Sequence, residues 1–378
     1  MAEKAEGETM RILVFGMSTN ICGGIESFLL NMNKFMSDDC IFDYVLLGNS
    51  AVFENAIQEN GGKAIYVTSY RKNPFKYILE LIKVLKENKN DHKAAYFNLF
   101  SMVHMFPVLF CRIFGYKIIL HSHNNNLQQS SKLYKLLHKL NRALFGKMKC
   151  LRLTTSDAST EFMFGKKKNA ELIYNAIDVE KFKYNHLMRE KIQKELGISE
   201  KIVIGFSGRL SPQKNPLFLI EAFEAIHRQN NNTVLLMAGE GELRSDIEKS
   251  IHDKKLDSCV IMLGNRNDIE DIYQAMDLFL LPSLFEGLGI VLIEAQCAGL
   301  PCVVSADVIP RIVEITPYIS RVSLDAAPDE WSKAALDLLE AQKNYDRSNG
   351  YGYVEKSHFN ITREAPRLEK IIKSDSRI

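Results

Sequence analysis

Short apolar segments with strand character alternate with segments of helical periodicity along most of this chain. In the first half the strand-like segments are Ile12–Gly16, Tyr44–Gly48, Lys63–Val67, Ala94–Phe97, Lys117–His121 and Cys150–Thr155, with helical segments such as Ile25–Met36 and Phe75–Glu87 between them. The pattern restarts with strands Ile202–Ser207, Thr233–Ala238, Cys259–Leu263, Leu278–Pro282 and Cys302–Ser305 and helices Pro216–Arg228, Leu243–Asp253 and Ile269–Met276. Such alternation is typical of βαβ units, so the sequence predicts an α/β fold of two Rossmann-like domains, each a doubly wound parallel sheet.

The length of the chain agrees with two domains, because 378 residues exceed what one ordinary core holds. We expect a polar tail at 1–10, a first domain at 11–180, a polar linker at 181–200 and a second domain at 201–358. A last helix at 359–378 would cross back to the first domain. A ligand would be enclosed in the cleft between the two domains.

Composition excludes several other classes of protein. Hydrophobic residues make up 46% and charged residues 25%, as in globular proteins. The longest apolar runs, such as Met105–Phe110, are far shorter than the roughly 20 residues of a membrane span, and the first residues are polar rather than signal-like. The seven cysteines lack any Cys-x-x-Cys pair. These features predict a cytoplasmic protein with reduced thiols.

Charge is unevenly distributed although the net charge is only +2. Residues 1–186 carry 25 Lys/Arg and 17 Asp/Glu, a net charge of +8, and the remainder carries 23 and 29, a net charge of −6. The first half therefore faces either an anionic surface or substrate, or simply solvent. Nothing in the pattern indicates nucleic acid.

The segment Leu278–Leu300 places two carboxylates around a glycine-rich turn at the end of a predicted buried strand. Gly287 and Gly289 open the turn, and Ile290–Gly299 has the pattern of a helix. Ligands of parallel α/β sheets bind beyond the carboxyl ends of the strands, where helix N-termini offer free N–H groups. Glu286 in the loop and Glu294 in the second helical turn could contact different parts of one ligand.

Two further loops carry groups suited to an anionic ligand. Arg209 and Lys214 follow the strand Ile202–Ser207 and could bracket a diphosphate, Arg as a fork and Lys as a point charge. Gly23 and Gly24 follow the first strand and allow close approach of a phosphate or a second substrate. The spacing after Gly16 does not fit Gly-x-Gly-x-x-Gly, which disfavours a dinucleotide site.

The segment FEGLGIVLIEAQCAGLPCV resembles the Glu-x7-Glu signature of retaining glycosyltransferases of family 4, which have the GT-B fold, and especially bacterial exopolysaccharide and capsule enzymes. Three other segments agree in the expected order: ICGGIES near the N-terminus, HSHN at 121–124 and GFSGRLSPQKNPLFLIEAF at 205–223. The resemblance runs from about residue 11 to about residue 370.

The resemblance implies a role for each site residue. Arg209 and Lys214 would bind the donor diphosphate, and His123, rather than His121, would contact the donor sugar near its reacting end. Glu286 would act by positioning and electrostatics more than as a covalent nucleophile, and Glu294 would accept hydrogen bonds from the ribose. The remaining donor contacts would come from the backbone of Gly287, Leu288, Gly289 and Ile290 and from the base-flanking loop at Arg266 and Asn267, with Gly23 and Gly24 on the other side.

No metal and no other cofactor is expected. The sequence has no cluster of Asp or His at metal spacing and no Asp-x-Asp between strands, so Arg209 and Lys214 would neutralise the leaving group.

The segment 131–152 carries seven Lys/Arg and no acid, interleaved with leucines. A basic amphipathic helix of this type can lie on anionic lipid. The alternative is a helix whose apolar face packs on its own sheet. In the first case the protein would sit at the inner face of the cell membrane.

These features together predict a metal-independent, retaining glycosyltransferase that moves a sugar from a nucleotide diphosphate donor, with UDP-sugars favoured, to a lipid-linked glycan acceptor. Two alternatives stay open: a nucleotide-sugar epimerase of the same fold, and a catalytically silent subunit that binds sugar nucleotides.

Overall fold

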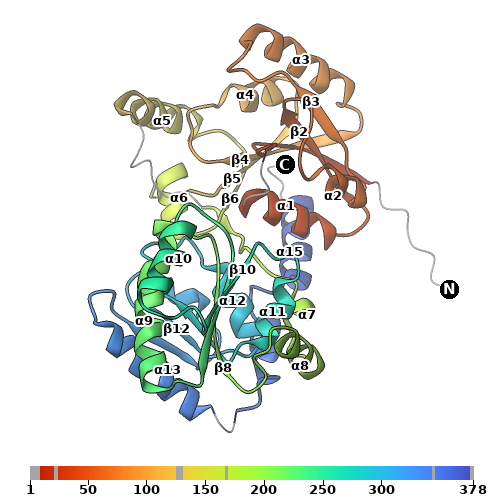
Figure 1. The fold of residues 1–378 in the computed structure, drawn as a ribbon. Coiled ribbons are helices and arrows are strands. Elements are labelled where there is room, and N and C mark those ends of the chain that lie inside the picture. The colour runs from red at the N-terminus through yellow and green to blue at the C-terminus, as the bar shows by residue number, and fades with distance from the viewer. Residues whose placement is uncertain (1–8, 21–23, 125–130, 167–168, 343–344, 375–378) are drawn as a thin grey trace, which may run out of the picture. The chain divides into compact units, whose positions relative to one another are not determined.

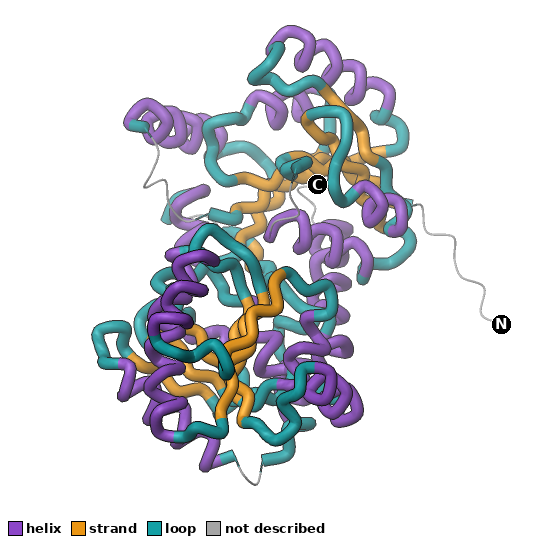
Figure 2. Tube along the Cα trace, in the orientation of Figure 1, coloured by secondary structure: helices purple, strands orange, loops and turns teal. Residues whose placement is uncertain are grey.

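The computed structural model describes residues 9–20, 24–124, 131–166, 169–342 and 345–374. The chain forms two compact units: unit 1 comprises Met1–Asn175 and Ile361–Ile378, and unit 2 comprises Ala176–Asn360. Each unit contains one parallel sheet with helices around it (Figures 1 and 2). The α/β class predicted from the sequence, with two Rossmann-like sheets, is confirmed.

Unit 1 has a seven-stranded parallel sheet in the order β3-β2-β1-β4-β5-β6-β7. Its strands are β1 (Met10–Phe15), β2 (Cys40–Leu47), β3 (Ala64–Val67), β4 (His92–Leu99), β5 (Lys117–Ser122), β6 (Leu151–Thr154) and β7 (Glu171–Leu172). Its helices are α1 (Gly24–Lys34), α2 (Glu54–Glu59), α3 (Pro74–Glu87), α4 (Phe106–Ile113), α5 (Lys132–Phe145), α6 (Asp157–Phe164) and α15 (Ile361–Ser374).

The last helix, α15, belongs to unit 1 although it follows the whole of unit 2 in the sequence. It lies beside α1, and its Glu369 accepts hydrogen bonds from the Ser37 backbone N–H at 2.8 Å and from the Ser37 hydroxyl at 2.5 Å (Figure 1). Glu364 accepts a third from the Tyr174 N–H at 3.0 Å. These charge-assisted contacts close the unit with its own C-terminal segment.

Unit 2 has a six-stranded parallel sheet in the order β10-β9-β8-β11-β12-β13. Its strands are β8 (Ile202–Ser207), β9 (Thr233–Ala238), β10 (Val260–Gly264), β11 (Leu278–Leu281), β12 (Cys302–Ser305) and β13 (Ile319–Val322). Its helices are α7 (Val179–Phe182), α8 (His186–Glu195), η1 (Pro212–Lys214), α9 (Pro216–Gln229), α10 (Arg244–Asp253), α11 (Ile269–Ala275), α12 (Ile290–Cys297), η2 (Arg311–Val313), α13 (Pro328–Ala341) and α14 (Asn349–Glu355).

The stretch 181–200 is not a linker in the structure. It contains the end of α7 and the whole of α8, and it lies within unit 2. This stretch is polar although it is helical, because α8 buries only Ile192 and Gln193 and exposes its other side to solvent. The chain passes between the units near Asn175 instead.

A buried carboxylate ties the amino ends of three strands in unit 1. Asp43 of β2 accepts two hydrogen bonds from Arg11 of β1, both 2.7 Å, one from His92 of β4 at 2.6 Å and one from the Lys63 N–H at 2.7 Å. Burial opposes ionisation of Asp43, but the hydrogen bonds from His92 and Arg11 outweigh it and lower its pKa. Four donors thus satisfy a charge that would otherwise be costly to bury.

Both sheets reverse their winding direction at one pair of neighbouring strands. In unit 1 the chain moves outward from β1 through β2 to β3 and returns to the other side at β4, and in unit 2 it does the same at β8 and β11. Open α/β sheets bind ligands at such switch points, beyond the carboxyl ends of the strands. The loops after β1, β4, β8 and β11 are therefore where a site is expected.

Two further observations bear on the environment of the protein. The six described cysteines, Cys40, Cys111, Cys150, Cys259, Cys297 and Cys302, are buried free thiols. None of the helices within the described ranges combines the length and the apolar content that a bilayer crossing requires.

Candidate functional site

The loops that follow β8 and β11 lie against each other at the carboxyl end of the unit 2 sheet. The two strands pair in parallel, with Leu278 opposite Ile204. Beyond them the Leu284 N–H donates to the Gln213 carbonyl at 2.8 Å, and the Gln213 amide donates to the Phe285 carbonyl at 3.0 Å. Residues about 70 positions apart in the sequence are thereby held at one place.

An ion pair forms where these loops meet. The Lys214 ammonium lies 2.5 Å from Oε1 of Glu286, and the Ser283 hydroxyl donates to the same oxygen at 2.8 Å. The side chains of Lys214 and Glu286 are only 13% and 5% exposed. Lys214 and Glu286, for which the sequence predicted separate roles, are thus in direct contact. Water screens their charges little, because both side chains are buried.

The loops after β8, β9 and β10 are joined by backbone hydrogen bonds. The Leu210 N–H donates to the Glu240 carbonyl at 2.9 Å, and the Gly239 N–H donates to the Gly264 carbonyl at 2.8 Å. A Cβ on Gly239 would lie 2.0 Å from the Gly208 carbonyl oxygen, so no larger residue fits there without a backbone shift. Glycine at position 239 therefore allows this close packing of the loops.

Arg209 lies at the exposed edge of the same group of loops. Its guanidinium is 3.3 Å from Glu242, and the two side chains are 74% and 51% exposed. An exposed ion pair of this kind contributes about 1 kcal/mol or less, so an anionic ligand could take Arg209 from Glu242 at little cost.

The turn Gly287–Ile290 leads into α12. Gly289 precedes the helix at φ 79°, a left-handed conformation that favours glycine, and Gly287 is exposed with nothing within 4 Å of a Cβ placed on it. The first N–H groups of a helix have no acceptors within it. In α12 the Leu292 N–H donates to the Gly289 carbonyl at 2.9 Å, which leaves those of Ile290 and Val291 for an anion or for hydroxyl groups.

Glu294 lies in the second turn of α12 and is partly exposed. Its Oε2 accepts a hydrogen bond from the Tyr273 hydroxyl at 3.0 Å. Burial raises the pKa of the Glu294 carboxyl to about 7, and the Tyr273 hydrogen bond opposes that rise only in part. Glu294 thus titrates near neutral pH, where a change in surroundings can change its charge.

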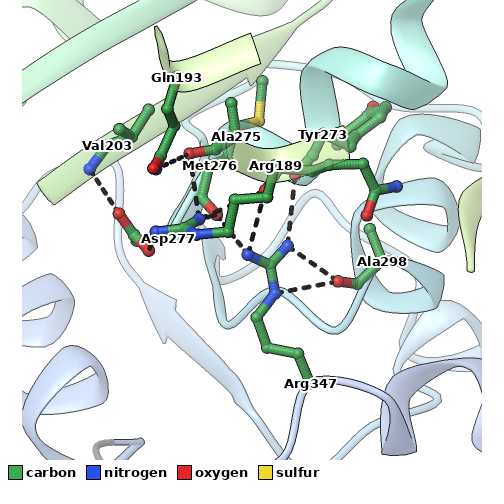
Figure 3. Close-up of polar contacts among 10 residues, drawn as sticks. Arg189, Gln193, Val203, Tyr273, Ala275, Met276, Asp277, Ala298 and Arg347 are labelled. Atoms are coloured by element: carbon green, nitrogen blue, oxygen red, sulfur yellow. Dashed lines mark hydrogen bonds and ion pairs between the residues drawn. The ribbon is translucent and has the colours of Figure 1, made fainter. Parts of the chain in front are cut away.

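Tyr273 is held in place by two arginines at the C-terminus of α11 (Figure 3). The guanidinium of Arg347 donates to the carbonyls of Met276 at 2.8 Å and Ala298 at 3.0 Å, and Arg189 donates to Asp277 at 2.7 Å. Burial lowers the pKa of Arg347 to about 10. The two cations satisfy carbonyls that a helix leaves without partners at its end, and they fix the helix that carries Tyr273.

Arg266 and Asn267 lie in the loop between β10 and α11, and both are exposed. The Arg266 guanidinium binds both oxygens of Asp268, at 2.8 and 2.5 Å. The structure therefore gives Arg266 a local partner, and the role of this loop beside a nucleotide base stays a prediction.

In unit 1 the carboxyl ends of β1 and β4 lie beside His123, the residue that directly follows β5. The Asn98 amide donates to the Phe15 carbonyl at 2.9 Å, so its Oδ1 is left to accept from Nε2 of His123 at 3.0 Å. Burial lowers the pKa of His123 to about 3, so the ring is neutral, with its proton on Nε2. Nδ1 is consequently an acceptor, suited to a hydroxyl group.

The neighbourhood of His123 explains two other features. Gly16 has φ 89°, and a Cβ there would lie 2.3 Å from the Asn98 carbonyl oxygen, so glycine is needed at the end of β1. His121 is fully buried, and its Nδ1 is 2.5 Å from the Tyr96 hydroxyl.

Gly24 opens α1 and is exposed, with nothing within 4 Å of an added Cβ, whereas Gly23 lies outside the described residues.

Three residues were not singled out from the sequence: Ser283 and Tyr273 in unit 2, and Asn98 in unit 1. Ser283 and Asn98 could have been found, because each is a polar residue at the carboxyl end of a buried strand: Ser283 follows β11, and Asn98 is the last residue but one of β4. Tyr273 gave no such signal, since it sits among core residues of α11. Among the described residues, no group of three or more His, Cys, Asp or Glu is arranged to hold a metal ion.

The chain is similar to known glycosyltransferases. Residues 188–354 match the family described as glycosyl transferases group 1. "Putative glycosyltransferase EpsF" of Bacillus subtilis (strain 168) is 28% identical over 329 residues, 82% of this chain and 83% of that protein. The UDP-Gal:alpha-D-GlcNAc-diphosphoundecaprenol alpha-1,3-galactosyltransferase of Escherichia coli is 31% identical over 240 residues, 61% of each protein.

The fold has a counterpart among solved structures. The crystal structure of Anabaena Alr3699/HepE in complex with UDP superposes with a TM-score of 0.80 at 18% identity, over 97% of this chain and all of the other. The strand order, the sequence motifs and the similar proteins all indicate a glycosyltransferase with two Rossmann-like sheets. The chain is a glycosyltransferase of the GT-B fold, and its residues 188–354 match the family described as glycosyl transferases group 1.

Proposed function

We propose that this glycosyltransferase moves a sugar from a UDP-sugar to a lipid-linked glycan acceptor, with retention of anomeric configuration, in the synthesis of a cell-surface polysaccharide. The observation that carries the proposal is the contact between Lys214 and Glu286 at the switch point of unit 2, with Glu294 on the helix that follows. The names of the Escherichia coli and Anabaena relatives support a UDP donor, and that of the Escherichia coli enzyme supports an acceptor linked through a diphosphate to a lipid.

In this proposal the donor lies over the carboxyl ends of β8 and β11. Lys214 and Arg209 bind its diphosphate, the turn Gly287–Ile290 contributes N–H groups, and Glu294 accepts from the ribose hydroxyls. The two cations neutralise the departing diphosphate, so the reaction needs no metal. Arg266 and Asn267 flank the base.

Glu286 acts on the sugar. Retention requires the acceptor to attack on the face from which the diphosphate leaves, through a transition state with positive charge on the sugar. The Glu286 carboxylate, oriented by Ser283, stabilises that charge, while Lys214 lies between the carboxylate and the leaving diphosphate. For His123 of unit 1 the contact with the donor sugar stays a prediction from the resemblance, and its Nδ1 is the atom that can accept a hydroxyl.

The lipid part of the proposal rests on α5, whose apolar face is exposed. Leu133, Leu136, Leu137, Leu140 and Leu144 are between 38% and 74% exposed, and His138 is its one buried residue. Polar contacts hold the helix to unit 1: Nδ1 of His138 accepts from the Met102 N–H at 3.1 Å, and Asn141 donates to the Met102 carbonyl at 2.7 Å. The leucines therefore do not pack on the sheet of their own unit.

The positive charge around α5 favours contact of this helix with an anionic surface. Residues 92–156 include ten Lys/Arg and no Asp/Glu, and seven of the ten lie in 131–152. A helix with exposed leucines and flanking cations binds lipid by apolar burial and by attraction to anionic headgroups. We place the protein at the inner face of the membrane, in contact through 131–152.

Lys214→Ala is expected to weaken UDP binding by about 10- to 100-fold, because a charge-assisted contact to a phosphate contributes about 1.5–3 kcal/mol. Isothermal titration calorimetry measures the effect. Arg228→Ala, which removes an exposed arginine paired with Asp329 on the same unit, serves as the control and should bind UDP normally. Equal UDP affinity in all three proteins would remove Lys214 from the donor site.

Glu286→Gln is expected to lower turnover by about 100-fold or more with little change in UDP affinity, because the amide keeps the shape and loses the charge that stabilises the transition state. Anomeric-proton NMR of the product should show retained configuration. A β-linked product from an α-linked donor, or a variant as fast as the parent, would refute this role for Glu286.

UDP affinity is expected to fall as the pH is lowered from 8 to 6, because protonation of Glu294, whose pKa is about 7, removes an acceptor for the ribose. Phosphate groups of UDP titrate in the same range, so the Glu294→Gln protein provides the reference. The ratio of wild-type to variant affinity should fall by about tenfold over this range. A ratio independent of pH would show that Glu294 does not bind as a carboxylate.

Transfer is expected to continue in excess EDTA, because Arg209 and Lys214 supply the positive charge at the leaving diphosphate. Release of UDP is a suitable assay. Activity that disappears with EDTA and returns with magnesium or manganese would contradict the proposal.

The double variant Leu136→Gln/Leu140→Gln is expected to bind anionic phospholipid vesicles at least about tenfold more weakly than the wild type, since burying one leucine contributes about 1.5–3 kcal/mol. Vesicle sedimentation measures this. Leu187→Gln, at a leucine of α8 that is 76% exposed, is the matched control. Undiminished binding by the α5 variant would exclude α5 as the contact.

A further inference from the structure

The Glu294 carboxylate has a single hydrogen-bond donor within the described part of the chain, the hydroxyl of Tyr273. This hydroxyl lies 3.0 Å from Oε2 of Glu294 and 3.2 Å from the carbonyl of Val291, three residues earlier in α12. Oε2 is thus occupied, and Oε1 remains for a ligand, because the Glu294 side chain is partly exposed. One carboxylate oxygen serves the scaffold and the other faces outward.

The side chain of Tyr273 has little freedom to move. It is fully buried, and the centroid of its ring lies 5.7 Å from that of Phe279 of β11 and 5.8 Å from that of Phe182 of α7. The backbone is held as well, because the Arg347 guanidinium donates to the Tyr273 carbonyl at 3.3 Å (Figure 3). With its ring and its backbone fixed by packing, Tyr273 presents the hydroxyl to α12 at a defined position.

The Tyr273 hydroxyl acts as a donor. Burial raises its pKa well above the ordinary value, and the charge of Glu294 adds to that rise, so the phenol keeps its proton. A hydrogen bond to an ionised carboxylate is stronger than one to a neutral carbonyl. The proton therefore goes to Glu294 when that group is charged, and it is free to turn to the Val291 carbonyl when Glu294 is neutral.

This one hydrogen bond supplies two things that a ribose hydroxyl needs from Glu294. It fixes the direction of the carboxylate, because Oε2 is tied to a side chain that is itself held. It also favours the charged form: burial raises the pKa of the Glu294 carboxyl, and the bond from Tyr273 opposes that rise. A charged, oriented carboxylate is the better acceptor for a hydroxyl group.

We propose that Tyr273 is a positioning residue for the donor: by holding Glu294, it makes the site prefer a nucleotide that has ribose hydroxyls over one that lacks them. The inference rests on the proposed function, in which Glu294 accepts from the ribose. Tyr273 acts through Glu294 alone, because it is fully buried. A site built to hydrogen-bond a hydroxyl rejects the analogue without it, since a polar group of the site is then left without a partner.

The test compares UDP with 2′,3′-dideoxyuridine diphosphate by isothermal titration calorimetry on the full chain. The wild type should bind UDP at least about tenfold more tightly than the analogue. Tyr273→Phe removes only the hydroxyl, so it should bind UDP about tenfold more weakly than the wild type and bind the analogue normally. The preference for ribose should therefore largely disappear, and normal binding of the analogue shows that the variant is folded.

Tyr351→Phe is the matched control. It removes another tyrosine–glutamate hydrogen bond of unit 2, the one between Tyr351 of α14 and Glu180 of α7, and it should keep the wild-type preference. A second comparison places Tyr273→Phe in a Glu294→Ala background. There it should change UDP affinity less than about twofold, because no carboxylate remains for the hydroxyl to hold.

The possible failures can be told apart. Tyr273→Phe with an unchanged preference, or with an equal loss of affinity for both ligands, would overturn the role of Tyr273, and so would a full loss of UDP affinity in the Glu294→Ala background. A wild type that binds both ligands equally would refute the ribose contact of Glu294 and the inference with it. A wild type that does not bind UDP would instead refute the proposed donor.

Discussion

The ion pair between Lys214 and Glu286 is the contact on which the site of unit 2 depends. Its two side chains are almost fully buried, and removing one partner of such a pair leaves an uncompensated charge that costs about 3–5 kcal/mol. The pair is tolerable because Ser283 adds a hydrogen bond and because Gln213 holds the loops after β8 and β11 together. The loops lie together because β8 and β11 are neighbours in the sheet. The ion pair therefore depends on this strand order.

Glu294 shows a second way in which the scaffold controls a carboxylate. Its hydrogen bond comes from Tyr273, and Tyr273 is positioned by a helix whose end is fixed by Arg189 and Arg347. Glu286 pairs directly with a lysine, whereas Glu294 has a tyrosine as its partner, and burial raises the pKa of Glu294 to about 7. Two glutamates eight positions apart therefore have different surroundings, which agrees with the different roles proposed for them.

Much of the fold could be predicted from the sequence because its signals are local. Ile202–Ser207 and Thr233–Ala238 were predicted with their observed bounds, since buried parallel strands are continuous apolar runs. The strand β7 was not predicted, because its two residues are too few for a periodic pattern. The helices α7 and α8 were not predicted either, because the stretch 179–195 is largely polar.

The arrangement of the site was less accessible to sequence reasoning. The motifs identified Lys214 and Glu286 but not their contact, which depends on pairing of strands distant in the sequence. Periodicity showed that the leucines of α5 share a face but not whether that face packs. The partners of Arg347 are backbone carbonyls, which leave no trace in the sequence. In unit 1 Asn98 was not singled out, because its hydrogen bond with His123 depends on the pairing of β4 with β5.

A double-mutant cycle on Lys214 and Glu286 tests most directly whether this ion pair is a working unit of the enzyme. Turnover at saturating donor would be measured for the wild type, Lys214→Met, Glu286→Gln and the double variant. If the two side chains act through each other, the double variant will retain at least about tenfold more activity than the product of the two single losses implies. Losses that simply multiply would show that Lys214 and Glu286 act independently and would contradict the coupling of leaving group and carboxylate proposed here.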